Sequence, residues 1–137
     1  MDALFNSLEY LFNFWPMMLL FVGVALGIVV GSIPGLTTTM LITLTLPLTF
    51  FMESVDAITL LIGMYVGGIS GSQIAATLLR MPGTPASIMT TFDGYPMSQQ
   101  GKSERALGLG ITASFVGGIV SWIFLAILLP PLAKLAL

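Results

Sequence analysis

The chain has 137 residues, with four Lys or Arg and six Asp or Glu. A soluble domain of this length would be about a quarter charged, and a disordered chain would be polar and charge-rich. Hydrophobic residues make up 56% and the mean hydropathy is +1.03, so the composition argues strongly against both classes and predicts a membrane protein. A net charge of −2 gives nucleic-acid binding no electrostatic support.

The first half of the chain predicts two hydrophobic segments separated by a helix break. Residues 1–14 carry apolar side chains at helical spacing, which predicts an interfacial helix on the bilayer surface. A span over about residues 15–32 follows, with Trp15 at headgroup level. Pro34-Gly35 breaks the helix. Residues 36–52 are threonine-rich, contain Pro47, and form either a short crossing or a re-entrant hairpin.

The second half predicts two further spans joined by a polar connection. The span over about residues 57–79 contains Gly-Gly-Ile-Ser-Gly-Ser-Gln at residues 67–73, a composition that predicts a loosened or broken helix. Residues 81–105 form the connection, in which Asp93-Gly94 signals a turn. The last span, residues 106–129, is expected to stop at Pro130-Pro131.

The fold class is therefore an all-α membrane protein, a single transmembrane domain over residues 1–137. It should have about four hydrophobic helical segments, at least one broken or re-entrant, and an N-terminal interfacial helix. A spanning helix needs about 20 mainly apolar residues, so four crossings leave no room for a separate soluble domain.

Small residues recur every four positions along three of the spans. Such a stripe removes side chains from one face of a helix and lets another backbone approach closely. The residues assigned to packing or structure are Gly23, Gly27, Gly31, Gly63, Gly67, Gly110, Ser114, Gly118, Asp93 and Gly94.

The basic residues indicate an orientation. Arg80, Lys102 and Arg105 flank the polar connection, so the bias of Lys and Arg towards the cytoplasm predicts that this side is cytoplasmic. Three full crossings before the connection would put the N-terminus outside, whereas a hairpin at residues 36–52 would put it inside.

Three polar features compete as the site of chemistry. A helix that starts after Pro34-Gly35 leaves unpaired N–H groups at its positive end, where anions bind; the alternative is a tight turn whose threonines bond to their own helix. An unwound stretch at residues 67–73 would offer carbonyls, N–H groups and hydroxyls; the alternative is close packing. At the third, Arg80 either attracts a carboxylate or snorkels from an ordinary loop.

Helix ends rather than basic side chains are expected to hold an anionic substrate, because the chain has four cations in all. The expected substrate-binding residues are Pro34, Gly35, Thr37, Thr38, Ser70, Gly71, Ser72, Gln73, Pro82, Gly83 and Thr84.

Enzyme signals are poor. The chain has no Cys and no His, which removes thiolate nucleophiles, imidazole bases and their metal sites. Asp93 stands without a second membrane-embedded carboxylate, so the sequence does not predict an aspartyl protease. No Walker-type phosphate loop is present, so it does not predict a nucleotide-binding site of that kind either. We therefore expect no catalytic residue, no metal site and no cofactor, and an intramembrane enzyme is the weakest interpretation.

Four motifs occur in an order that resembles the N-terminal part of the large membrane subunit of the tripartite tricarboxylate transporter family. They are Gly27-x-x-x-Gly31-x-x-Pro34-Gly35-Leu36, Tyr65-x-Gly67-Gly68-x-Ser70-Gly71-Ser72, Pro82-Gly83-Thr84-Pro85 and Asp93-Gly94-Tyr95-Pro96-Met97. The resemblance implies a multi-pass permease subunit of a secondary transporter for carboxylates such as citrate, in the bacterial inner membrane. It also implies a coupling cation, proton or sodium, and two partners: a small membrane subunit and a periplasmic solute-binding protein.

The chain departs from that family in two ways. Family chains are several times longer, with a second half thought to repeat the first, so we expect this chain to be a fragment, a split polypeptide or a partial product. Arg80 stands where a small polar residue is expected before Pro-Gly. A non-transporting membrane assembly subunit is the main alternative, but a scaffold has no need for broken helices at mid-membrane.

Overall fold

The computed structural model describes the backbone of residues 12–136 and the side chains of residues 12–129. Every regular element within those bounds is helical: α2 (Phe14–Gly31), α3 (Thr38–Thr49), α4 (Ser54–Leu79), the 3-10 helix η1 (Pro85–Ser87), α5 (Thr90–Gln99) and α6 (Ser103–Ala136). The all-α prediction is confirmed. The expected interfacial helix over residues 1–14 lies outside the described residues, apart from its last three.

Three of the helices are long and apolar enough to cross a bilayer: α2, α4 and residues Ser103–Leu129 of α6. Helix α3 is apolar but has 12 residues, or about 18 Å at 1.5 Å per residue, which falls short of a hydrocarbon core of about 30 Å. The chain is therefore a multi-pass membrane protein with one incomplete helix among its crossings.

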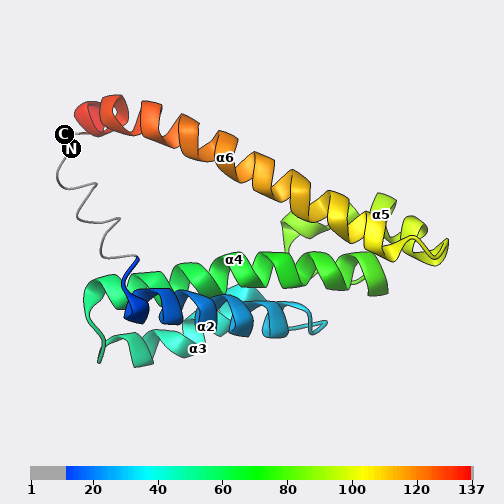
Figure 1. Cartoon of the computed structure of the whole chain (residues 1–137), viewed down its shortest axis with the longest axis horizontal. Coiled ribbons are helices and arrows are strands. Elements are labelled where there is room, and N and C mark those ends of the chain that lie inside the picture. Colours follow the sequence, from blue (N-terminus) through cyan, green and yellow to red (C-terminus); the bar gives the residue numbers. More distant parts are fainter. Residues whose placement is uncertain (1–11, 137) are drawn as a thin grey trace.

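Helices α2 and α4 lie side by side and run in the same direction (Figure 1). Their contact is the most extensive among the described elements. Glycines of one helix face glycines of the other, in the pairs Gly23 with Gly63, Gly27 with Gly67 and Gly31 with Gly71. A Cβ added at Gly63 would lie 2.8 Å from the carbonyl oxygen of Leu20. The obstructing atoms are backbone atoms, so a side chain there would push the helices apart.

The first turns of α2 and α4 lie at the same end of the molecule. The indole nitrogen of Trp15 donates a hydrogen bond of 3.1 Å to the carboxylate of Asp56. Arg80, the C-cap of α4, therefore lies at the opposite end. Because α2 and α4 begin at the same end of the molecule and run in the same direction, residues 32–53 must lead from the end of α2 back to the beginning of α4. A re-entrant hairpin at residues 36–52 does not fit this arrangement, and three crossings precede the polar connection.

The return crossing consists of a turn over residues 32–35, the two residues Leu36 and Thr37, and helix α3. Helix α2 ends at Gly31, and the predicted break after it is confirmed, with Gly35 at φ +92°. Helix α3 does not begin until Thr38, whose side chain lies against Gly68 near the middle of α4. The start of α3 therefore lies beside the middle of α4 and close to the C-terminal end of α2, because a Cβ at Gly31 would also collide with Gly68.

The predicted break at residues 67–73 is wrong, because α4 is continuous from Ser54 to Leu79. The small residues of this stretch serve close approach instead. Gly67 faces the backbone of α2, Gly68 faces Thr38, and a Cβ at Gly71 would lie 2.9 Å from the amide nitrogen of Ser32. With neighbours on several sides, α4 keeps its backbone hydrogen bonds and has no reason to unwind.

The predicted turn at Asp93-Gly94 is also wrong, because both residues lie inside α5. Asp93 is in the first turn of that helix, where a carboxylate is favoured by the helix dipole. A Cβ at Gly94 would lie 3.1 Å from the hydroxyl oxygen of Thr77, so the glycine lets α5 pack on α4. Tertiary packing here outweighs the local turn preference.

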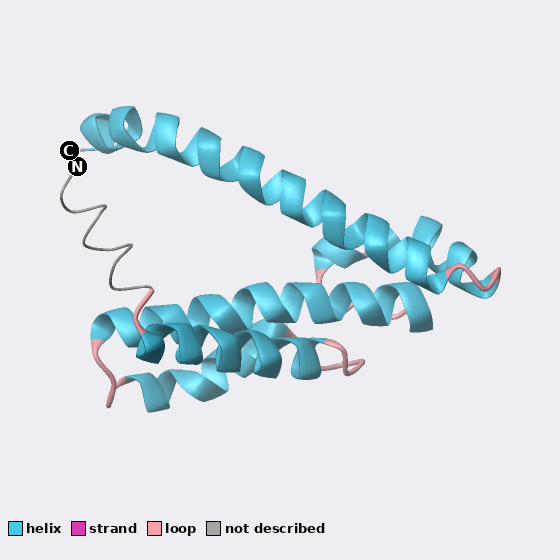
Figure 2. Ribbon diagram, in the orientation of Figure 1, coloured by secondary structure: helices cyan, strands magenta, loops and turns pink. Residues whose placement is uncertain are grey.

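Helix α6 packs on α5 and on the second half of α4, then diverges from α4 towards its C-terminal end (Figure 2). It continues through Pro130-Pro131, so the expected stop there is wrong. In hydrocarbon, a helix that continues past a proline leaves fewer backbone groups unpaired than one that unwinds.

Candidate functional site

The start of α3 combines a helix N-terminus with a buried, unpaired hydroxyl. Thr38 is 3% exposed, and its Oγ1 has no hydrogen-bond partner among the described residues. Thr37 is the N-cap: its Oγ1 accepts from the amide of Met40 at 3.2 Å, and its carbonyl accepts from Leu41. The first amides of the helix, at Thr38 and Thr39, have no intrahelical acceptor. Donors thus converge at the positive end of α3.

Most other hydroxyls of α3 are paired within the helix. Thr43 donates to the carbonyl of Thr39 at 2.8 Å, and Thr45 and Thr49 donate to carbonyls three or four residues earlier. For these side chains the structural alternative is correct: each threonine hydroxyl donates to a carbonyl of its own helix. Pro34 and Gly35 are exposed in the turn before α3. Among the residues expected in this feature, Thr38 is the one whose hydroxyl is both buried and unpaired.

Ser72 anchors the segment after α4. It is 1% exposed, and its Oγ accepts from the amide of Gly83 at 3.0 Å. The same oxygen lies 2.8 Å from Oγ of Ser87 and 3.3 Å from Oγ1 of Thr84. Gly83 also lies close to the C-terminal end of α2, since a Cβ there would be 3.6 Å from the carbonyl oxygen of Gly31. The structure thus brings Gly31, Ser72, Gly83 and Thr84 together.

The remaining residues of the second feature point elsewhere. Ser70 donates to the carbonyl of Val66 at 3.0 Å, so its hydroxyl is paired within α4. Gly71 packs against α2. The side-chain amide of Gln73 faces α6, where its nitrogen would collide with a Cβ at Gly110. The expected substrate-binding residues are therefore divided between different faces of α4.

Arg80 lies at the exposed end of α4. It is the C-cap, at φ +57°, and its guanidinium lies 5.7 Å from the centre of the Tyr95 ring, a cation–π geometry. Twelve residues separate it from Gly68, which is about 18 Å along a helix. Arg80 is therefore positioned far from the start of α3.

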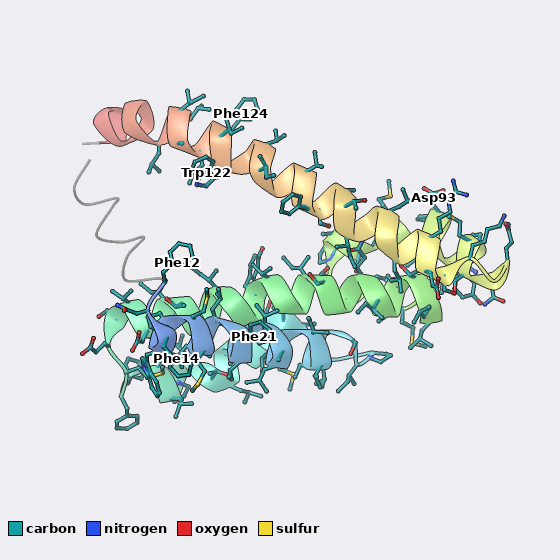
Figure 3. All side chains as sticks on the ribbon, in the orientation of Figure 1. Phe12, Phe14, Phe21, Asp93, Trp122 and Phe124 are labelled. Atoms are coloured by element: carbon teal, nitrogen blue, oxygen red, sulfur yellow. The ribbon has the colours of Figure 1, made fainter. Side chains whose placement is uncertain are left out.

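A cavity of about 570 Å³ lies between α4, η1, α5 and α6. Its polar lining residues are Gln73, Ser87, Thr90, Asp93 and Ser114. Figure 3 shows Asp93 on α5, beside the first turns of α6. Ser87 and Thr90 are not among the residues predicted from the sequence. The signal that could have found them is a hydroxyl at every third residue from position 84 to position 90.

The stripe on α6 has two different environments. Gly110 is in close contact with Gln73, and Ser114 lines the cavity. A Cβ at Gly118 would meet nothing within 4 Å in the described part of the chain. No group of three or more potential metal-ligating His, Cys, Asp or Glu side chains occurs among the described residues.

Comparison with known proteins gives a consistent result. The sequence profile of the Tripartite tricarboxylate transporter TctA family matches residues 17–137. An uncharacterized 52.8 kDa protein in the TAR-I ttuC′ 3′ region of Agrobacterium vitis is 41% identical over 117 residues. That match covers 85% of this chain and 23% of the relative, so the chain spans about a quarter of the relative's length. No solved structure matches the chain.

Proposed function

The chain belongs to the tripartite tricarboxylate transporter TctA family, and we propose that it forms the N-terminal part of the permease of a secondary, ion-coupled carboxylate transporter. In this proposal the permease works with a small membrane subunit and a periplasmic solute-binding protein in the bacterial inner membrane. The basic end of α4 and α6 faces the cytoplasm and α2 starts on the outer side. The substrate is a di- or tricarboxylate such as citrate, and the coupling ion is a proton or sodium.

The start of α3 is the observation that carries the proposal. The N-terminus of α3, which lies beside the middle of α4, bears about half a positive charge and points unpaired amides at its surroundings. The unpaired, buried Oγ1 of Thr38 is an additional donor at that point. Helix ends at mid-membrane bind anionic groups in other secondary transporters. We assign one substrate carboxylate to the amides of Thr38 and Thr39 and to the Thr38 hydroxyl.

The positions of the basic residues favour a site built from a helix end. Arg80 lies about 18 Å further along α4, and Lys102 and Arg105 lie beyond it near the start of α6. A Lys or Arg at the bilayer centre would cost roughly 2.5–3.5 kcal/mol on insertion scales. A helix end avoids that cost. Its weaker attraction also suits a transporter, which has to release what it binds.

The buried hydroxyl further suggests that the site has two states. In this structure Oγ1 of Thr38 packs against Gly68, and an unpaired buried hydroxyl costs about 1–3 kcal/mol. A carboxylate that pairs this hydroxyl would favour a conformation in which the start of α3 has moved away from α4. We therefore propose that substrate binding and movement of α3 are linked.

Thr38→Val tests the assignment, because it removes the hydroxyl and keeps the shape. Uptake of labelled citrate by the complete permease with its partners should need about tenfold more substrate, since a hydrogen bond to a charged group contributes about 1.5–3 kcal/mol. Thr43→Val is the matched control: its hydroxyl is bonded to its own helix, so uptake should be unchanged.

The structural alternative predicts the opposite result for Thr38→Val. If the hydroxyl has no ligand, valine removes an unsatisfied group, and the protein becomes more stable while transport is unaffected. Wild-type affinity in this variant would refute the site, and a non-transporting assembly subunit would become the better interpretation.

A further inference from the structure

The cavity between α4, η1, α5 and α6 contains one charged side chain. Of the described residues that line it, Asp93 is the only ionisable one, and the other polar lining groups are the amide of Gln73 and the hydroxyls of Ser87, Thr90 and Ser114. Among the described side chains, the charged groups on α4, on α6 and at the ends of these helices nearest to α5 are Asp56, Arg80, Lys102, Glu104 and Arg105, and none of them lines the cavity. No ion pair involving Asp93 occurs in the described structure.

These groups suit a cation and oppose a carboxylate. A carboxylate, an amide oxygen and hydroxyls are the oxygen ligands that hard cations prefer. An anionic substrate in the same cavity would face the Asp93 carboxylate with no Lys or Arg among the described lining residues to compensate it, and like charges repel. The cavity volume of about 570 Å³ also leaves room for waters around a small ion.

The cavity is physically connected to the break in the return crossing. Ser87 lines the cavity, and its hydroxyl lies 2.8 Å from that of Ser72. Ser72 in turn accepts from the amide of Gly83, which lies close to the carbonyl of Gly31 where α2 ends. A change in the occupancy or charge of the cavity can therefore reach the segment that leads to the start of α3.

We infer that Asp93 binds the coupling cation, a proton or Na⁺, in this cavity, while the substrate carboxylate binds at the start of α3. This inference rests on the proposed function. The bound cation neutralises the Asp93 carboxylate, the only negative charge among the described lining residues, and it is later released unchanged from the same carboxylate. By linkage, a cation that strengthens substrate binding must itself be bound more tightly when substrate is present.

The test compares two transport modes in proteoliposomes that contain the complete permease. Accumulation of labelled citrate against its gradient needs the coupling cation, whereas exchange of labelled for unlabelled citrate needs no net cation movement. Asp93→Asn should reduce accumulation at least tenfold and preserve exchange. Glu104→Gln is the matched control, because it removes a carboxylate near the start of α6 that does not line the cavity; it should preserve both modes.

Separate pH and Na⁺ gradients identify the cation, since only the coupled one drives wild-type accumulation. Accumulation by Asp93→Asn at the wild-type level would overturn the inference, as would equal loss of accumulation and exchange in a correctly folded variant. If Asp93→Asn does not fold, Asp93→Glu replaces it. A severalfold shift in the half-saturating cation concentration then supports the inference, and an unchanged value overturns it. Absence of both modes in the wild type would refute the proposed function instead.

Discussion

The contact between α2 and α4 makes a quantitative prediction for Gly67→Ala. An alanine Cβ at this position would lie 2.9 Å from both Cα and the carbonyl carbon of Val24, and closer still to its carbonyl oxygen. Carbon atoms pack best at about 3.5–4.0 Å, so the two helices would have to separate by at least about 0.6 Å. No rotation of a side chain can relieve this overlap, because the obstructing atoms are backbone.

The energetic consequence follows from that separation. A gap of 0.5–1 Å removes a quarter to a half of the dispersion energy of each affected contact, and overpacking typically costs about 1–3 kcal/mol. Gly118→Ala is the matched control, because a Cβ there meets nothing within 4 Å in the described chain. Alanine should stabilise that position by about 0.5–1 kcal/mol through helix propensity.

The assay is reversible unfolding of the purified chain in mixed micelles, followed by circular dichroism. Gly67→Ala should lower the free energy of unfolding and Gly118→Ala should leave it equal or higher. Gly27→Ala combined with Gly67→Ala should cost less than the sum of the two single changes, because the first separation already makes room for the second. If Gly67→Ala were as stable as Gly118→Ala, the close-approach argument would be wrong.

Two further predictions concern the end of α4. Ser72→Ala should lower stability by about 1–3 kcal/mol in the same assay, because the amide of Gly83 loses its acceptor; Ser70→Ala, whose hydroxyl is bonded within its own helix, should change stability by less than about 0.5 kcal/mol. Arg80→Gly should be stabilising or neutral, since glycine adopts φ +57° without strain. Arg80→Ala should be less stable than Arg80→Gly, and the reverse order would contradict the left-handed cap.

The parts of the fold that depend on local chemistry could be predicted from the sequence. Long apolar segments with few charges predict the three spanning helices. Pro34-Gly35 predicts the helix break, because a proline and a glycine at positive φ interrupt a helix locally, whatever packs around it. The glycines at residues 67–73 predict a helix break that α4 does not have. Glycine weakens an isolated helix and equally permits close packing, and only the partner helix decides which effect dominates.

The candidate site was harder to predict for the same reason. Thr38 has the same side chain as five other threonines of residues 36–52, and what distinguishes it is its position against Gly68, a contact across 30 residues of sequence. Asp93 and Gly94 carry a strong local turn signal, yet the fit of Gly94 against Thr77 keeps them helical. The polar segments can be located from the sequence, but the face of α4 on which each of their side chains lies depends on contacts between helices.

The register of the paired glycines has a consequence for how the protein is made. Each glycine of α2 meets a partner 40 positions later, as in Gly23 with Gly63 and Gly27 with Gly67. When α2 leaves the ribosome, its partner has not yet been synthesised. The glycine face of α2 must therefore stay in contact with lipid, or with the insertion machinery, until α4 has been synthesised and inserted. Because α3 is too short to span by itself, the three segments gain a stable arrangement only as a set, and insertion of this region has to be completed late and cooperatively.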